Sequence, residues 1–130
     1  MLELNFEFDV KTASTDQLAF VGDAVYSLLV REYLCKIGKC RSNDLHTASA
    51  KIVKANSQAN AYKAIENMLS EKEISVYKRG RNAHNNHKPK NSTECDYHSA
   101  TGFEALFGYL YLAKQNERLI ELFNIISKDF

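Results

Sequence analysis

The stretch DQLAFVGDAVYSLLVREYL, residues 16–34, constrains the fold most, because it sets an acidic residue in the middle of an apolar helical pattern. On a helical wheel at about 100° per residue, one broad apolar stripe emerges. The stripe consists of Leu18, Val21, Val25, Leu28 and Leu29. Asp23 lies opposite it, between Phe20 and Tyr26. Since burying an unpaired charge is costly, we expect a half-buried Asp23 that pairs with another group or binds a metal.

A second stretch, ATGFEALFGYLYL at residues 100–112, repeats this arrangement with Glu104 as its single charge. Small residues accompany both acids: Ala19 and Gly22 in the first stretch, Ala100 and Gly108 in the second. Helices with small residues can approach closely, so we expect the two helices to bring Asp23 and Glu104 together. Two convergent carboxylates make a site for a hard divalent cation.

Structural roles explain the same two acids equally well on spacing alone. Thr101 and Glu104 have the T-x-x-E spacing of a capping box, which would place Glu104 at the start of a helix. Asp23 would then be an ordinary buried acid paired with an arginine. The spacing leaves both alternatives open.

Five motifs, taken together, resemble one known family. FVGDAVY at 20–26 resembles the signature stretch of the ribonuclease III catalytic domain, and FEALFGYLYL at 103–112 resembles its second acidic motif. Three more stretches resemble mini-ribonuclease III, the subgroup that has only the nuclease domain. They are NDLH at 43–46, SAKIVKANSQA at 49–59 and KRGRNA at 78–83. The resemblance runs in the family's order from about Leu18 to Leu122.

The resemblance implies a metal site. Asp23 and Glu104 match the essential acidic positions, as catalytic residues and as ligands of Mg²⁺, for which Mn²⁺ can substitute. Asp16 matches another acidic position and is a further candidate ligand, through a water molecule. The full-length enzymes have two more acids, at the positions of Ala19 and Thr101. The mini subgroup resembles this chain in lacking both. Fewer carboxylates predict weaker metal binding.

The resemblance also implies an activity. It indicates an endoribonuclease that hydrolyses double-stranded RNA to 5′-phosphate and 3′-hydroxyl ends, in a homodimer whose two sites cut opposite strands. The implied substrate is the precursor of large-subunit (23S) ribosomal RNA, which would give the protein a role in ribosome biogenesis. The main alternative is a non-catalytic double-stranded-RNA-binding module on the same fold, with chemistry lost at Ala19 and Thr101. A helical protein-interaction bundle is the third hypothesis, and it leaves the two isolated acids unexplained.

Positive charge is concentrated between Glu73 and Glu94, where we expect a long irregular connection from Gly80 to Tyr97. The segment has no acid and holds Lys78, Arg79, Arg81, Lys88 and Lys90. The chain has 17 basic and 16 acidic residues, so the rest of the chain has 12 basic residues and all 16 acidic ones. A basic loop suits contacts with RNA phosphates, and we expect these five residues and Asn82 to bind RNA. A merely solvated loop is the alternative.

Length and composition predict an all-α fold, a ribonuclease III catalytic-domain-like helical bundle in one domain over residues 1–130. The chain is 45% hydrophobic and has a single proline, Pro89. No second domain fits, so the nuclease domain itself must grip RNA, together with a second copy.

The chain shows no signal peptide and no apolar stretch near the ~20 residues that span a membrane. Its three cysteines, Cys35, Cys40 and Cys95, form no metal-binding or disulfide pattern. We therefore expect a cytoplasmic protein with no membrane association.

Capping signals place the helices. Ser14 with Gln17 indicates the start of the first helix, and Gly38 its end. A helical region from residues 42–44 to about 68 should be broken, because one helix of that length is unusual here. Ser70 with Glu73 indicates another start, with an end at Gly80. The acidic helix is expected from about 99 to 114, followed by a last amphipathic helix.

Overall fold

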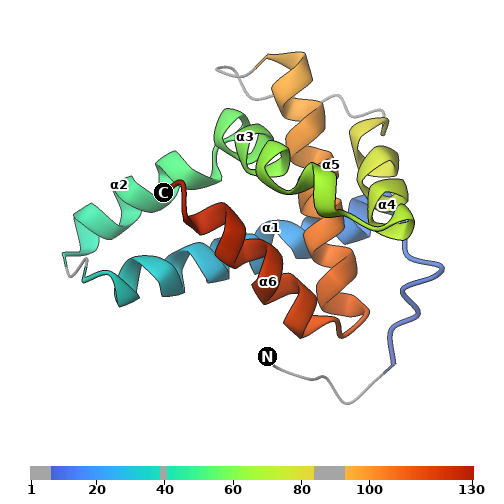
Figure 1. Cartoon of the computed structure of the whole chain (residues 1–130), viewed down its shortest axis with the longest axis horizontal. Coiled ribbons are helices and arrows are strands. Elements are labelled where there is room, and N and C mark those ends of the chain that lie inside the picture. Colours follow the sequence, from blue (N-terminus) through green and yellow to red (C-terminus); the bar gives the residue numbers. More distant parts are fainter. Residues whose placement is uncertain (1–6, 39–40, 84–92) are drawn as a thin grey trace.

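The computed structural model describes residues 7–38, 41–83 and 93–130, and within these ranges it contains helices and no strand. The elements are α1 (Thr15–Lys36), α2 (Ser42–Val53), α3 (Ala55–Ile65), the short 3₁₀ helix η1 (Glu66–Met68), α4 (Glu71–Arg81), α5 (Glu94–Leu112) and α6 (Asn116–Ser127). Figure 1 shows their arrangement. The all-α prediction is confirmed. Within the same ranges, none of the helices combines the length and the apolar character needed to cross a membrane.

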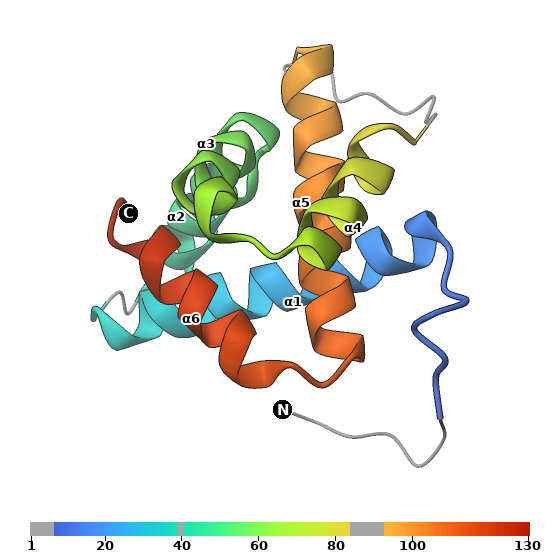
Figure 2. The ribbon, with the colours of Figure 1, turned by 45° about the vertical axis from the view of Figure 1, so that its right-hand side comes forward.

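Helix α5 is the centre of the structure. It packs against α1, α3, α4 and α6, and Figure 2 shows it crossing α1. The core at this crossing contains the fully buried rings of Tyr26, Phe103 and Phe107. The Tyr26 ring meets Phe103 edge-on, with ring centroids 4.8 Å apart, a favourable geometry for two aromatic rings. Leucines of α5 and α6 close the core from the other side.

The predicted capping boxes are confirmed at two helix starts. Ser14 caps α1: its hydroxyl accepts from the Gln17 N–H at 3.1 Å, and the Gln17 side chain accepts from the Ser14 N–H. Ser70 and Glu73 make the same pair of bonds at the start of α4. Gly38, with φ at +92°, follows the end of α1 as predicted.

Other boundaries differ from the sequence prediction. Helix α4 does not end at Gly80 but continues to Arg81. A Cβ atom on Gly80 would lie 2.7 Å from the Gly102 Cα, so this glycine allows α4 to touch α5 and does not end a helix. Helix α5 begins at Glu94, not near residue 99, because Thr93 caps it. The predicted irregular connection is therefore shorter.

The long helical region from residue 42 is broken, as predicted, and the break lies at Lys54. This residue has an extended backbone, with φ at −70° and ψ at 159°, and it separates α2 from α3. The N-cap of α2 is Arg41, which makes no side-chain capping bond. None of the three candidates predicted at residues 42–44 is therefore the N-cap of this helix.

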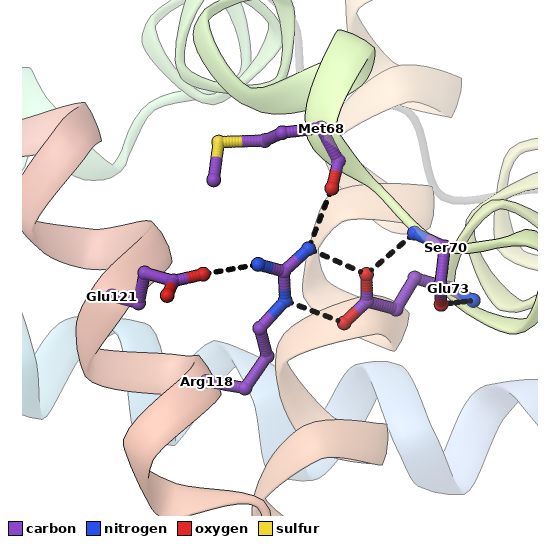
Figure 3. Close-up of polar contacts among 5 residues, drawn as sticks. All are labelled: Met68, Ser70, Glu73, Arg118 and Glu121. Carbon is purple, nitrogen blue, oxygen red and sulfur yellow. Dashed lines mark hydrogen bonds and ion pairs between the residues drawn. The ribbon is translucent and has the colours of Figure 1, made fainter.

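One buried ion pair attaches the start of α4 to α6 (Figure 3). Glu73 is only 4% exposed, and its carboxylate accepts two hydrogen bonds from Arg118, each 2.9 Å long. Arg118 also donates to the Met68 carbonyl and to Glu121. Burial alone would raise the pKa of Glu73, but the hydrogen bonds from Arg118 and Ser70 outweigh it, so this pKa lies below its usual value. The structure therefore holds Glu73 charged.

Replacing Arg118 with Met should destabilise the fold by about 3 kcal/mol, because it leaves the Glu73 carboxylate buried without a partner. The control is Glu121→Gln, which removes the exposed partner of the same arginine and should cost less than about 1 kcal/mol. Urea unfolding at neutral pH measures both. Equal losses in the two variants would contradict a special role for the buried pair.

Candidate active site

The backbones of α1 and α5 touch where both helices carry glycine. A Cβ atom on Gly22 would lie 1.6 Å from the Glu104 carbonyl oxygen, and one on Gly108 would lie 1.8 Å from the Leu18 carbonyl oxygen. No side chain fits at either position. Because Asp23 directly follows Gly22, this contact brings its carboxylate to Glu104, as the small residues predict.

The two carboxylates of Asp23 and Glu104 interact directly. Burial is the largest effect on Glu104, and the hydrogen bond and negative charge of Asp23 add to it, so the pKa of Glu104 rises to about 8. A hydrogen bond between two carboxyl groups requires a proton on one of them. Without a cation, Glu104 therefore keeps its proton at neutral pH.

The exposure of the two acids differs from the sequence prediction. Glu104 is partly buried, but Asp23 is exposed and not half-buried. The covering helices pack on Leu18, Gly22 and Val25, which are buried on another side of α1. Asp23 is left on the open side, next to Ala24, which is also exposed.

The structure contradicts both structural explanations of the acids. Thr101 and Glu104 lie inside α5, and the Thr101 hydroxyl donates to the Tyr97 carbonyl, so they form no capping box. In the described ranges, the ion pairs are those of Arg118 with Glu73 and Glu121, and no arginine answers Asp23. Among the residues that the structure describes, the acidic pair has no basic partner.

The carboxylate oxygens of Asp23 and Glu104 suit a small, hard cation as ligands. A divalent ion would relieve the repulsion between two ionised carboxylates, and Mg²⁺ typically takes one or two carboxylates, several waters and substrate phosphates. No group of three His, Cys, Asp or Glu side chains is placed for a metal among the residues that the structure describes. Asp16 therefore does not join the pair directly. Asp16 and Glu104 both lie near enough to Tyr97 to raise its pKa, although burial is the largest cause of that rise.

Gln58 is a residue at this site that the sequence analysis missed. Its amide lies close enough to Glu104 to oppose the rise in the pKa of that carboxyl group. Gln58 is 3% exposed, and its Nε2 also donates to the Val53 carbonyl at 2.8 Å. One signal was available: Gln58 occupies the place of an apolar residue in the stripe that continues with Ala61, Tyr62 and Ile65. A polar residue in such a stripe needs a hydrogen-bond partner.

The predicted RNA-binding residues lie partly on a helix. Lys78, Arg79 and Arg81 are exposed in the last turns of α4, and Asn82 is its C-cap, so they do not belong to an irregular loop. The Arg81 guanidinium stands 5.8 Å from the centre of the Tyr77 ring. Lys88 and Lys90 lie outside the described residues.

Comparison with known proteins decides the family. Residues 16–115 match the model of the ribonuclease III domain. The chain belongs to the ribonuclease III family. It is therefore an endoribonuclease of the ribonuclease III type, in a family that acts on double-stranded RNA and generally depends on divalent metal. This result favours the nuclease over the non-catalytic module and the interaction bundle.

Relatives in the ribonuclease III family are similar over most of their length. The Mini-ribonuclease 3 of Enterococcus faecalis is 44% identical over 118 residues, which is 89% of each chain. That of a Thermoanaerobacter species is 49% identical over 102 residues, 78% of this chain and 72% of the relative. A crystal structure of a Fusobacterium nucleatum protein superposes with a TM-score of 0.83 at 33% identity, covering 93% of this chain and 97% of that one.

The free energy of unfolding of the metal-free enzyme should fall as the pH rises from the ordinary pKa of a glutamate to the raised pKa of Glu104. Its pKa is about 8 in the folded state, against an ordinary value of 4.5 for a glutamate side chain. The folded protein therefore binds more protons between these values, and its stability declines from pH 5 to pH 9. Glu104→Gln removes this decline and should be more stable than the wild type at pH 9 by about 1–3 kcal/mol.

Urea unfolding with a chelator at pH 5, 7 and 9 measures the effect. Glu117→Gln, on an exposed part of α6, is the matched control and should follow the wild-type profile. Parallel profiles for wild type and Glu104→Gln would show that the carboxyl group is not perturbed.

Proposed function

We propose that Asp23 and Glu104 bind Mg²⁺, or Mn²⁺ in its place, and are the catalytic residues for hydrolysis of double-stranded RNA. The observation that carries this proposal is the carboxylate pair itself: two acids that interact, one of them partly buried, with no ion pair to a basic side chain among the described residues. Such a pair costs stability and is explained by a cation between the two groups.

Each acidic side chain has a different role in this proposal. When bound, the cation supplies a more acidic water and stabilises negative charge at the scissile phosphate. Glu104 is partly buried and held inside α5, so it anchors the site from the protein side. Asp23 is exposed and supplies the second carboxylate. Asp16 contributes through water, and the products carry 5′-phosphate and 3′-hydroxyl ends.

Asp23→Asn and Glu104→Gln should each lower the cleavage rate of a duplex RNA by more than about 100-fold, since even the loss of a group that only orients a metal ligand costs about 10–100-fold. Duplex binding and the circular dichroism spectrum should stay close to wild type, because size and helix packing are kept. Single-turnover cleavage with Mg²⁺, beside a gel-shift assay, measures both. Asp44→Asn, on the exposed start of α2, is the control. Near-wild-type cleavage by either site variant would refute the site.

We also propose that the protein is a homodimer. A groove between α1 and α6 is lined by apolar side chains that a soluble monomer would leave in water. Its most exposed members are Phe20 at 83%, Leu28 at 49%, Ile37 at 52% and Ile120 at 51%. Asp23 lines the same groove. A second copy on this face would set two catalytic sites beside one duplex, which suits paired cuts in opposite strands.

Ile120→Lys should convert a dimer at micromolar concentration into a monomer, because it puts a charge in the centre of the apolar groove. Met68→Lys is the matched control, since Met68 is another exposed apolar residue, at 37%, and does not line the groove. Light scattering after size exclusion gives the mass of each. A wild-type monomer, or an Ile120→Lys dimer, would contradict this interface.

The cations of α4 are proposed to hold the RNA backbone. Gly80 touches Gly102, which is two residues before Glu104, so the end of α4 lies beside the part of α5 that carries the acid. Lys78, Arg79, Arg81 and Asn82 extend from this end, and Lys88 and Lys90 follow in sequence. We take the natural substrate to be 23S ribosomal RNA precursor and the location to be the cytoplasm, on the family resemblance and on a cysteine spacing that shows no disulfide pattern. One nuclease domain over residues 1–130 performs both binding and cleavage.

A further inference from the structure

We propose that Tyr77 is a positioning residue that holds the Arg81 guanidinium in place for contact with one phosphate of the RNA backbone. The inference rests on the proposed binding of duplex RNA by the end of α4. Three contacts carry it: the guanidinium over the Tyr77 ring, its hydrogen bond to Asn82, and the packing of that ring on α5.

The Tyr77 ring is fixed by residues of two other helices. It stacks on the Tyr62 ring of α3, with centroids 3.6 Å apart and planes only 7° from parallel. Its hydroxyl shares a hydrogen bond of 3.0 Å with the Ser99 hydroxyl of α5. A Cβ atom on Gly102 would lie 2.7 Å from Cδ2 of the ring, so the ring lies directly on the α5 backbone. Because Tyr77 is also buried, its ring is a rigid support.

Two contacts orient the exposed Arg81 side chain. Its guanidinium carbon stands over the Tyr77 ring, 5.8 Å from the centroid, where the negative face of the ring attracts a cation. Its Nε donates to Oδ1 of Asn82 at 3.2 Å. Within the described ranges, the two terminal nitrogens have no hydrogen-bond partner, and the ion pairs belong to Arg118. The terminal nitrogens are therefore available to an anion.

The two neighbouring cations at the end of α4 lack this support. Lys78 is exposed, and Arg79 donates a long bond of 3.4 Å to the Ala13 carbonyl. Neither stands over an aromatic ring in the part of the chain that the structure describes. A guanidinium presents a planar fork that matches two phosphate oxygens, and this fork is effective when its direction is fixed. Arg81 meets that condition through Tyr77.

Tyr77 also connects the guanidinium to the helix that carries Glu104. Its two contacts on α5, Ser99 and Gly102, lie within the two turns of helix that precede this acid. A guanidinium held on this ring keeps a constant position relative to Glu104, which a freely rotating side chain would not. Phosphate contacts set the register of a nucleic acid on a protein. Arg81 would therefore help to determine which phosphodiester bond reaches the acidic pair.

Arg81→Lys tests the contact, because it keeps the charge and removes the planar fork. Binding of a fluorescent duplex RNA, followed by anisotropy with a chelator present, should weaken about 10-fold. Arg79→Lys, the same change at a guanidinium without a supporting ring, should weaken binding less than about threefold. Single-turnover cleavage at saturating RNA and Mg²⁺ should change less than about threefold in both, since the acidic pair is intact. Arg41→Lys, at the exposed N-cap of α2, is the control for the substitution.

A double-mutant cycle tests the positioning role of Tyr77. Tyr77→Leu should weaken duplex binding about fivefold in the wild type and should have no further effect in Arg81→Ala. Tyr77→Phe keeps the ring and should recover most of the affinity. If the leucine variant does not fold, the comparison of Arg81→Lys with Arg79→Lys decides.

Equal losses in the two lysine variants would overturn the proposal, as would additive losses in the cycle, because a merely structural effect of Tyr77→Leu does not depend on Arg81. A wild type that does not bind the duplex, or whose affinity does not fall with added salt, would instead refute the proposed RNA binding by α4.

Discussion

The direct contact between the backbones of α1 and α5 is the constraint on which the rest of the structure depends. Gly22 and Gly108 leave no room for a side chain, so the two helices meet at their main chains. The same contact brings the rings of Tyr26 and Phe103 together in the core. It also sets Asp23 beside Glu104. Core packing and the acidic pair therefore share one cause, and a change that separates these helices would damage both.

The chain treats its two buried or partly buried glutamates in opposite ways. Glu73 lies at the start of α4, and Arg118 supplies a matched guanidinium that keeps it charged. Glu104 meets a second acid in place of a base, and its pKa rises to about 8. An arginine at that position would stabilise the fold and exclude a cation. Among the residues that the structure describes, Glu104 thus has no counter-charge, whereas Glu73, in its structural role, has one.

Sequence patterns predicted what depends on local chemistry, and they failed where distant helices decide. The boxes at Ser14 and Ser70 need only residues three apart, and both were predicted correctly. The exposure of Asp23 depends on which sides of α1 its neighbours cover, and a helical wheel does not contain that information. Gly80 was interpreted as a helix end because a sequence does not show that Gly102 lies against it. Gln58 was missed because a sequence does not show that its amide lies near Glu104, which belongs to a different helix.

The position of Asp23 connects assembly with chemistry. Asp23 is one of the residues that line the apolar groove, whereas Glu104 belongs to α5 and is not among them. In a lone chain the groove side of this pair is open to water, which weakens every charge interaction there. A second copy that covers Phe20 and Leu28 would exclude water from that side and strengthen the attraction between the carboxylates and a cation. Dimer formation would then complete the metal site as well as provide two of them.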